Sequence, residues 1–344
     1  MKAVLLPGDR RVEVVERPDP TPGPGEVVVR TRASALCRSD MSLYYGNPIV
    51  GGDDAGKGMV IPGHEPAGDV VELGPGVEGL EVGDRVTIYL AIGCGRCEHC
   101  LAGYRMLCAE WKCLGFDVDG GDADYLVVPA INCLKLPEEL SYEAGAVLTD
   151  MVGTQYHTQK RLSVSGATTV AIFGLGPMGA AGVLVAKGRG ARVIAVDVLD
   201  DRLALAGELG ADDAVNSSQE DAVERLRELT GGRGVDVAVD CSGAPPAQNA
   251  ALDAACARGA VAFVGESQST TINPSDQIIR KVLRVIGGWY FPLWEYREIA
   301  DFVVRQQLAP ERLVTHRFPI ADAETAFRLF DERKTEKAVF VWEG

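Results

Sequence analysis

The chain has 344 residues, of which 47% are hydrophobic and 24% charged, and a formal net charge of −15. A chain this long usually divides into about two domains, and its negative charge, without a basic stripe, would repel a phosphate backbone, so we expect no nucleic-acid partner. It has no apolar run of membrane-spanning length and no signal-peptide pattern, so we expect a cytoplasmic protein without a membrane partner.

The first 140 residues are rich in glycine and proline and contain short β-branched runs. Such runs, separated by turn residues, are typical of an irregular, mostly β domain. The predicted strands lie at residues 26–34, 68–74, 84–91 and 124–129.

From about residue 151, apolar runs alternate with longer helical patterns. This alternation predicts βαβ units and a parallel sheet, and hence an α/β fold with a doubly wound sheet. The apolar runs lie at 168–174, 191–198, 235–243 and 259–266, and the helical patterns at 177–190 and 200–211. After residues 282–290 the alternation stops, and two amphipathic helices are predicted at 295–307 and 321–334, before a final strand at 337–342.

A glycine-rich segment directly after the first of these apolar runs predicts a dinucleotide site. Gly174, Gly176 and Gly179 form GxGxxG, which permits a tight turn, a close approach of the pyrophosphate and close helix–strand packing. The next predicted strand ends in Asp197, whose carboxylate would bind ribose hydroxyls and repel a 2'-phosphate, favouring NAD over NADP. The alternative is a glycine-rich turn in an α/β domain that binds no nucleotide.

Four cysteines lie within fifteen residues in the segment IGCGRCEHC and beyond it: Cys94, Cys97, Cys100 and Cys108. Four thiolates suit tetrahedral zinc and fill its coordination shell, so we expect this zinc to be structural. Spacing alone does not choose the metal, and an iron–sulfur cluster is the alternative. His99 reads as an exposed loop residue and not as a further ligand.

A catalytic zinc needs three protein ligands and an open position. The scattered candidates are Cys37, His64 and Asp150. Each has another explanation: Cys37 as a buried thiol, His64 as a turn residue and Asp150 as a helix N-cap. Spacing alone therefore does not decide whether this second metal site exists.

The chain resembles the medium-chain zinc-dependent alcohol dehydrogenase family from end to end. The resemblance rests on CRSD, PGHEPAG, VGDRV, the four-cysteine loop, GDADYLVVP, GLGPMG and DCSG. It implies a GroES-like, mostly β catalytic domain built from residues 1–150 and 291–344, with a structural zinc lobe at about 93–113. It also implies a Rossmann NAD-binding domain at residues 151–290.

The resemblance assigns roles to residues of the catalytic domain. Cys37, His64 and Asp150 match the catalytic zinc ligands, with the aspartate as in bacterial secondary-alcohol dehydrogenases, and Glu65 matches a glutamate behind the zinc that can join its shell. Asp40 matches the carboxylate that orients the histidine, and Ser39 the hydroxyl that contacts the substrate oxygen. Some relatives end the proton relay with a histidine where this chain has Ser42, so we expect the proton to leave through ribose hydroxyls and water.

The resemblance also assigns cofactor contacts. Thr154 matches a residue at the nicotinamide face, and Arg202 and Lys337 match basic positions near the adenosine and the pyrophosphate. With the glycine-rich turn and the acid, the expected NAD contacts are Thr154, Gly174, Gly176, Pro177, Met178, Gly179, Asp197, Arg202 and Lys337.

We therefore expect a zinc-dependent oxidoreductase that transfers hydride between an alcohol and NAD. The likeness around Asp150 favours a secondary alcohol or a polyol as this substrate. Two zinc ions per chain are expected, one catalytic and one structural. A zinc-dependent aldehyde or ketone reductase and a non-catalytic NAD-binding redox sensor are the alternatives. The resemblance implies a homo-oligomer, a tetramer or otherwise a dimer, in which the strand at 282–290 pairs across an interface.

Two segments bear on the substrate, an alcohol or carbonyl compound of small size. The Gly- and Asp-rich stretch at 51–58 reads as a flexible surface loop that would admit a polar or bulky substrate. The aromatic run at 287–294 reads equally as packing, in the core or between subunits, and as part of a substrate site.

Overall fold

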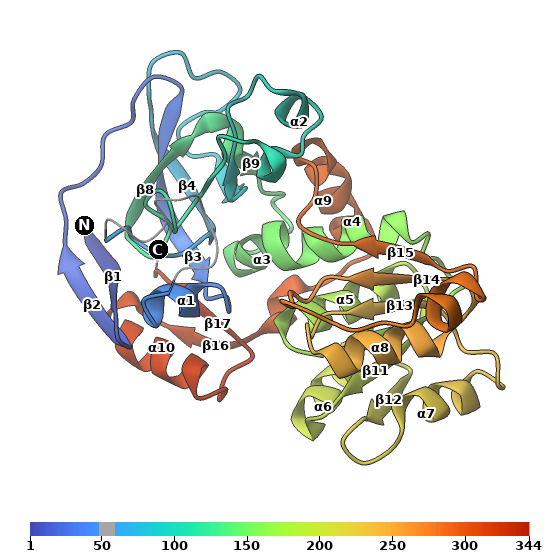
Figure 1. The fold of residues 1–344 in the computed structure, drawn as a ribbon. Helices are drawn as coiled ribbons and strands as arrows, with labels where there is room; N and C mark the ends of the chain where they lie inside the picture. The colour runs from blue at the N-terminus through green and yellow to red at the C-terminus, as the bar shows by residue number, and fades with distance from the viewer. Residues whose placement is uncertain (48–58, 344) are drawn as a thin grey trace. The chain divides into compact units, whose positions relative to one another are not determined.

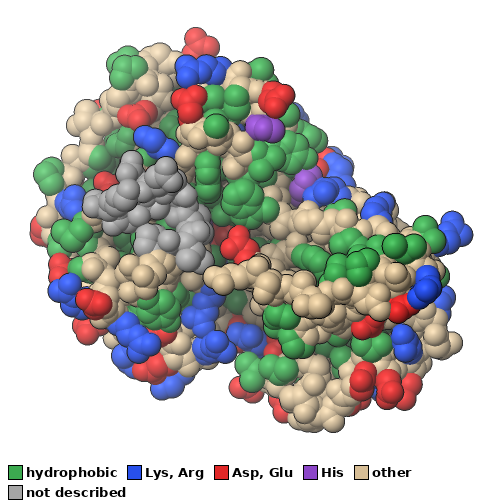
Figure 2. All heavy atoms as spheres, in the orientation of Figure 1, with side chains coloured by type: hydrophobic (Ala, Val, Ile, Leu, Met, Phe, Trp, Pro, Cys, Tyr) green, Lys and Arg blue, Asp and Glu red, His purple; other side chains and the backbone are tan. Residues whose placement is uncertain are grey.

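The computed structural model describes residues 1–47 and 59–343, so the stretch at 51–58 lies outside the described residues. The chain divides into two compact units (Figure 1). The first comprises Met1–Asp150 and Phe291–Gly344, and the second comprises Met151–Tyr290. No described helix is long and apolar enough to cross a membrane. Charged side chains of both signs are interspersed over the face drawn in Figure 2.

The first unit is built around a sheet with the order β16-β17-β3-β4-β5-β9, in which β8 also pairs with β3. A hairpin of β1 and β2 and a two-stranded ribbon of β6 and β7 accompany it. Its strands are β1 Lys2–Gly8, β2 Arg11–Glu16, β3 Glu26–Ala35, β4 Glu65–Leu73, β5 Arg85–Ile88, β6 Ala91–Ile92, β7 Lys112–Cys113, β8 Tyr125–Pro129, β9 Cys133–Lys135, β16 Val314–Phe318 and β17 Lys337–Val341. Its helices are α1 Asp40–Tyr44, α2 Glu98–Leu101, α3 Tyr142–Val147, α9 Tyr296–Arg305 and α10 Ala323–Asp331, and its short turns are η1 Arg105–Leu107, η2 Ala130–Asn132, η5 Leu293–Glu295, η6 Pro310–Leu313 and η7 Ile320–Asp322.

The strands predicted for this unit are present, but their bounds differ from the predicted ones. The hairpin of β1 and β2 was not predicted. The run at 84–91 was expected as one strand, but it forms β5 and β6, which belong to different sheets. The two amphipathic helices and the final strand of the tail are present as α9, α10 and β17, and β17 pairs with β3.

The second unit is a six-stranded parallel sheet with the order β12-β11-β10-β13-β14-β15. Chain order reverses between β10 and β13, which is the switch point of a doubly wound Rossmann fold. Helices α5 and α6 contact each other and β11, and α7 packs against α8, which contacts β13 and β14 (Figure 1). The strands are β10 Thr169–Phe173, β11 Arg192–Asp197, β12 Asp213–Asn216, β13 Val235–Asp240, β14 Ala255–Phe263 and β15 Arg284–Gly287. The helices are α4 Gly153–Arg161, α5 Pro177–Gly188, α6 Asp200–Glu208, α7 Ala222–Leu229, α8 Pro245–Ala254 and the π-helical η4 Pro274–Ile279.

Apolar strands explain why this sheet is covered on both faces. Strands β10, β11 and β13 are almost wholly buried, and β14 is buried except at residues 257–258 and at its half-buried last residue. A strand that is apolar on both sides needs a layer of helices on each face, and the alternating helices supply it. The α/β fold with a doubly wound sheet is thereby confirmed.

Candidate functional site

The first candidate site is a cluster of four ligand groups in the first unit. Ligand atoms of Cys37, His64, Glu65 and Asp150 all lie within 4.8 Å of one another. Antiparallel pairing of β3 with β4 places Ala35 opposite Glu65, so Cys37, two residues beyond β3, comes close to His64, directly before β4. Strand register therefore unites groups that are 27 residues apart.

Asp150 reaches the cluster from a π-helical turn. This turn, η3 Leu148–Val152, lies between α3 and α4, and Asp150 is 5% exposed within it. A π-turn interrupts a helix with one wider turn and is frequent at functional sites. The alternative role of Asp150 as a helix N-cap is wrong, because the N-cap of α3 is Ser141 and that of α4 is Val152.

The separations in this cluster suit a shared metal. His64 Nε2 is 3.6 Å from Asp150 Oδ2, and Cys37 Sγ is 3.8 Å from the same oxygen. Tetrahedral zinc with Zn–N and Zn–O lengths of about 2.0 Å and Zn–S of about 2.3 Å separates its ligand atoms by roughly 3.3–3.5 Å. Three donors of the types that zinc prefers thus lie a few tenths of an ångström beyond coordination spacing, and the residues fit this metal.

His64 is oriented by Asp40 at its back. Nδ1 of His64 is 2.9 Å from Asp40 Oδ1, so Nε2 faces the cluster. Burial lowers the pKa of His64, but Asp40 and Asp150 outweigh burial and raise this pKa well above its ordinary value. Phe116, fully buried, packs its ring against the imidazole with centroids 5.5 Å apart. The carboxylate fixes the tautomer, as is usual for metal-binding histidines, and the phenyl ring limits rotation of the imidazole.

Ser39 borders the same cluster. Its hydroxyl lies 3.5 Å from His64 Nε2, on the side where the metal-binding atoms meet. The hydroxyl of Ser42 donates a 2.6 Å hydrogen bond to the backbone carbonyl of Ser39. A side chain hydroxyl is therefore available beside the cluster, and the next one along α1 is tied to the backbone.

Glu65 is held by a buried lysine. Lys337 Nζ is 2.6 Å from Glu65 Oε1, and both side chains are at most 1% exposed. Burial raises the pKa of Glu65, and this shift favours the neutral acid. Burial lowers the pKa of Lys337, but the negative charge of Glu65 outweighs burial and raises this pKa, and that shift favours the ion pair. We assign the ion pair, because a neutral Glu65 would leave a buried ammonium uncompensated. The other oxygen, Oε2, is buried without a hydrogen-bond partner and remains available to a cation.

The pyrophosphate contact expected of Lys337 stays a prediction. In the described structure its ammonium is fully buried and engaged by Glu65. Sequence position alone gave no sign of this ion pair, since the two residues are 272 positions apart.

A support beneath His64 was missed by sequence analysis. The amides of Gly121 and Asp122 donate to the carbonyls of Gly63 and Pro62, at 2.7 and 3.0 Å. Gly63 has φ +94°, and a Cβ there would lie 2.3 Å from the carboxylate of Asp122. The motif GDADYLVVP contains this aspartate. An acidic residue between a glycine and a run of apolar residues was the sequence pattern that could have indicated a buried structural role for Asp122.

Asp122 is itself an unusual buried acid. It is fully buried, accepts a 2.6 Å hydrogen bond from the hydroxyl of Ser34, and its Oδ2 has no partner. Burial, reinforced by Asp40, raises the pKa of Asp122 to about 7.

The second candidate site is the four-cysteine loop. The sulfur atoms of Cys94, Cys97, Cys100 and Cys108 lie within 4.8 Å of one another. Amides of Cys94, Cys100 and Glu110 point at sulfur, at 3.3 to 3.5 Å. Backbone amides of Arg96 and Cys97 lower the pKa of Cys94 to about 6, whereas burial raises the pKa of Cys100 to about 12. A thiolate at neutral pH and amides directed at sulfur fit a bound tetrahedral cation.

Residues around this loop contact it but are not among its four clustered cysteine ligands. The side chain of His99 is 46% exposed and is not one of the clustered ligands. Trp294 donates from Nε1 to the carbonyl of Ala102 and lies against Gly103. Phe291 is fully buried edge-on against Tyr89, whose hydroxyl donates to the carbonyl of Phe291 at 2.6 Å. For Phe291 and Trp294 the structure supports packing within the first unit.

The third candidate site is the carboxyl end of the parallel sheet in the second unit. Gly174 adopts φ +81°, and a Cβ on Gly179 would lie 1.9 Å from the carbonyl oxygen of Gly174. A Cβ on Gly176 would meet nothing nearer than the guanidinium of Arg202, at 3.8 Å. Two glycines are thus required by the turn and by packing, and the third leaves a space above the start of α5, which begins with Pro177 and Met178.

Asp197 and Thr154 are the two other residues of the second unit for which the sequence predicts cofactor contacts beside Arg202. Asp197 ends β11 and accepts hydrogen bonds from the amides of Leu175, Val198 and Leu199, at 2.6 to 3.0 Å. Arg202 Nη1 lies 3.9 Å from the same carboxylate. Thr154 is 2% exposed, and its hydroxyl has no hydrogen-bond partner in the described residues.

The comparisons with known proteins point to one family. Residues 23–138 match the family described as alcohol dehydrogenase GroES-like domain, and residues 177–305 match the family described as zinc-binding dehydrogenase. An uncharacterized zinc-type alcohol dehydrogenase-like protein of Escherichia coli is 36% identical, with 98% of each chain covered. L-threonine 3-dehydrogenase of Pyrococcus horikoshii is 38% identical, covering 96% of this chain and 94% of the relative. A solved NAD-dependent alcohol dehydrogenase superposes with a TM-score of 0.88 at 32% identity over the whole of both chains.

A fold of a GroES-like unit and a Rossmann unit, with these two clusters, defines a zinc-type dehydrogenase. The chain belongs to the medium-chain zinc-dependent alcohol dehydrogenase family and is an oxidoreductase.

Proposed function

We propose that this protein is an NAD-dependent dehydrogenase of secondary alcohols or polyols, with one catalytic and one structural zinc per chain. The observation that carries the proposal is the convergence of Cys37, His64 and Asp150 on one point, with a side-chain hydroxyl beside it. Three protein ligands leave a zinc ion open to a fourth partner, whereas the four-cysteine site is closed.

The proposed ligands of the catalytic zinc are Cys37, His64 and Asp150, and Glu65 is the alternate ligand through its unpartnered Oε2. When bound, zinc supplies Lewis acidity that lowers the pKa of an alcohol, and the nicotinamide supplies the hydride acceptor. The ion pair with Lys337 engages Oε1 of Glu65, which lies 3.7 Å from Nε2 of His64. The lysine thereby competes with a metal ion for this oxygen and favours three protein ligands over four.

The chain's own residues orient the substrate and receive its proton. Asp40 keeps Nε2 of His64 directed at the cluster. Ser39 is placed to accept the hydroxyl proton of the substrate in a hydrogen bond, beside Nε2. Ser42 is not a base near neutral pH and donates to the backbone, so in this proposal the proton leaves through ribose hydroxyls and water.

The proposed cofactor contacts lie at the carboxyl end of the Rossmann sheet. Gly176 leaves room for the pyrophosphate, and the unpartnered hydroxyl of Thr154 would contact the nicotinamide. Asp197 would receive the adenosine ribose, because its carboxylate is already fixed by three amides and its charge repels a 2'-phosphate. Arg202, beside Gly176 and Asp197, would lie along the adenosine.

A secondary alcohol is the proposed substrate class. The relative named L-threonine 3-dehydrogenase acts, by its name, at a carbon that bears a secondary hydroxyl. The likeness around Asp150 to secondary-alcohol dehydrogenases points the same way. Reduction of the corresponding ketone or aldehyde is the reverse of this reaction at the same site.

The experiment is a spectrophotometric screen of the zinc-loaded protein with NAD against secondary alcohols, polyols, primary alcohols and aldehydes. We expect NADH formation with at least one secondary alcohol or polyol, at a kcat/KM at least about tenfold above that of primary alcohols of the same length. Absence of NADH formation from every alcohol, and of NADH oxidation by every carbonyl compound, would overturn the proposal.

We also propose a cytoplasmic homo-oligomer, a tetramer or otherwise a dimer. Strand β15 is the last strand of its sheet and has one unpaired edge in the described chain. An unpaired edge is a template for pairing with a second copy. Light scattering of the purified protein would test this, and a monomer at micromolar concentration would contradict it.

A further inference from the structure

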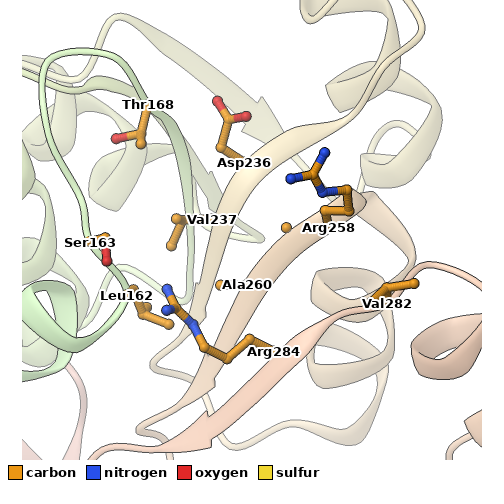
Figure 3. Close-up of a pocket in the computed structure, with 10 residues that line it drawn as sticks. Leu162, Ser163, Thr168, Asp236, Val237, Arg258, Ala260, Val282 and Arg284 are labelled. Atoms are coloured by element: carbon orange, nitrogen blue, oxygen red, sulfur yellow. The ribbon is translucent and has the colours of Figure 1, made fainter.

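A pocket of about 310 Å³ in the second unit borders the proposed interface between copies (Figure 3). Its lining includes Arg284, in β15, and Val282, two residues before that strand. A second copy that pairs with β15 would lie against these residues, so we assign no ligand to the pocket. Asp122, by contrast, is fully buried inside the first unit, where no second copy reaches it.

The segment that carries His64 is held by backbone hydrogen bonds from residues 120–122. Residues 59–63 belong to no helix or strand, so no sheet ladder fixes them. Three successive amides donate to three successive carbonyls at 2.7 to 3.0 Å, those of Gly120, Gly121 and Asp122 to those of Ile61, Gly63 and Pro62 respectively. The position of His64 therefore depends on where residues 120–122 lie.

The carboxyl group of Asp122 is clamped between this segment and β3. Its Oδ1 accepts a 2.6 Å hydrogen bond from the hydroxyl of Ser34, which lies opposite Pro66 in the register of β3 with β4. On its other side the carboxyl group lies directly against Gly63, where a Cβ would be 2.3 Å from Oδ1. The carboxyl group therefore sets the distance between β3 and the residue before His64.

The spacing of the proposed zinc ligands depends on this distance. Cys37 lies two residues beyond the end of β3, and His64 directly follows Gly63. Asp122 thus stands between the two chain segments that supply two of the three ligands. Asp40 orients the imidazole ring, whereas Asp122 places the backbone that carries it. Ligands must be held within about 0.5 Å of the productive geometry, so a small shift of this backbone weakens metal binding.

Stability alone does not explain an acid at this position. Asp122 forms no ion pair within residues 1–47 and 59–343, and its Oδ2 has no hydrogen-bond partner there. Burying such a group is unfavourable, and an apolar side chain would fill the same space without that penalty. What the carboxyl group contributes is the hydrogen bond from Ser34 and the close contact with Gly63.

We propose that Asp122 is a positioning residue of the open metal site. By holding Gly63 at a fixed distance from β3, it places His64 for zinc and raises the zinc affinity of the site formed by Cys37, His64 and Asp150. The inference rests on the proposed function, which assigns zinc to these ligands. The four-cysteine site does not depend on Asp122.

The test is equilibrium dialysis of the zinc-loaded protein against buffers of decreasing free Zn²⁺, with the zinc retained per chain counted by atomic emission. The binding step that Asp150→Asn abolishes reports the open site, and the other step reports the four cysteines. Asp122→Leu removes the acceptor, whereas Asp122→Asn keeps an acceptor oxygen. Asp124→Leu is the matched control, because the carboxylate of Asp124 lies in the same segment but accepts from the amide of Lys2 and from Trp342.

We expect Asp122→Leu to weaken zinc binding at the open site at least about tenfold, as is typical when the support of a metal ligand is removed. Asp122→Asn and Asp124→Leu should each change this affinity less than about threefold, and the four-cysteine site should keep its affinity in all three variants. If Asp122→Leu does not fold, Ser34→Ala, which removes only the hydroxyl, takes its place and should weaken the open site at least about threefold.

Three results in folded variants would contradict the positioning role: wild-type affinity in Asp122→Leu or in its substitute Ser34→Ala, equal weakening of both zinc sites, or equal losses in Asp122→Asn and Asp122→Leu. The first of these, with two zinc ions in the wild type, leaves the proposed function standing. A wild type that holds one zinc ion, unchanged by Asp150→Asn, overturns the proposed function and this inference with it.

Discussion

Replacing Lys337 by methionine tests the buried ion pair behind the proposed metal site. The pair is 2.6 Å long and at most 1% exposed on either side. Two unit charges at this distance attract each other by about 6 kcal/mol at an effective dielectric constant of about 20. Their desolvation offsets much of that attraction, but removing only the lysine leaves Glu65 buried and unpaired, so Lys337→Met should destabilise the protein by about 3–5 kcal/mol.

The assay is thermal unfolding of the zinc-loaded protein. At about 2–4 °C per kcal/mol for a domain of about 200 residues, the melting temperature should fall by roughly 6–20 °C. Lys334→Met is the matched control, because Lys334 is 65% exposed and pairs with Glu332 at the surface, and it should cost less than about 1 kcal/mol. Adding Glu65→Gln to Lys337→Met should recover part of the loss. A loss for Lys337→Met no greater than the control, or no recovery in the double variant, would refute the reasoning.

Three further changes test other parts of the structure. Asp197→Gly should lower the ratio of kcat/KM for NAD over NADP by at least about tenfold, since the repelling carboxylate is gone, while Asp201→Asn leaves it unchanged; an unaltered ratio for Asp197→Gly would contradict the ribose role. Cys97→Ser should cost at least about 3 kcal/mol of stability through loss of the structural zinc, with kcat preserved in the protein that remains folded, and a variant that melts like the wild type would refute a bound metal there. Asp122→Asn should alter the pH dependence of the unfolding free energy. A pKa of about 7 keeps Asp122 protonated in the folded protein at pH values where the same carboxyl in the unfolded chain has already ionised. The unfolding free energy of the wild type therefore falls by up to roughly 4 kcal/mol as the pH rises from about 4 to above 7, and that of the variant does not. Unfolding free energies at pH 5 and pH 8 that change equally in both proteins would count against this buried acid.

Local patterns made part of the site predictable. The four cysteines lie within fifteen residues, so spacing alone brought their thiolates together. The three glycines follow a buried strand and begin a helix, a context that fixes their roles without long-range information. The same holds for the Rossmann strands, whose continuous apolar runs predict burial on both faces.

The open site was not predictable from spacing, because its geometry is tertiary. Cys37 and His64 meet only through the register of β3 with β4, and Asp150 joins them only because the helix widens into a π-turn. Resemblance to a family supplied these three residues where physical reasoning left them open. It did not supply the ion pair of Glu65 with Lys337.

The most direct test of the central claim is the zinc content of the wild type and of Asp150→Asn. The wild-type chain should hold about two zinc ions, and the variant about one with little activity, because the four thiolates remain intact while the open site loses a charged ligand. An Asp150→Asn protein that retains two zinc ions and full activity would contradict the assignment of Cys37, His64 and Asp150 as the catalytic metal site.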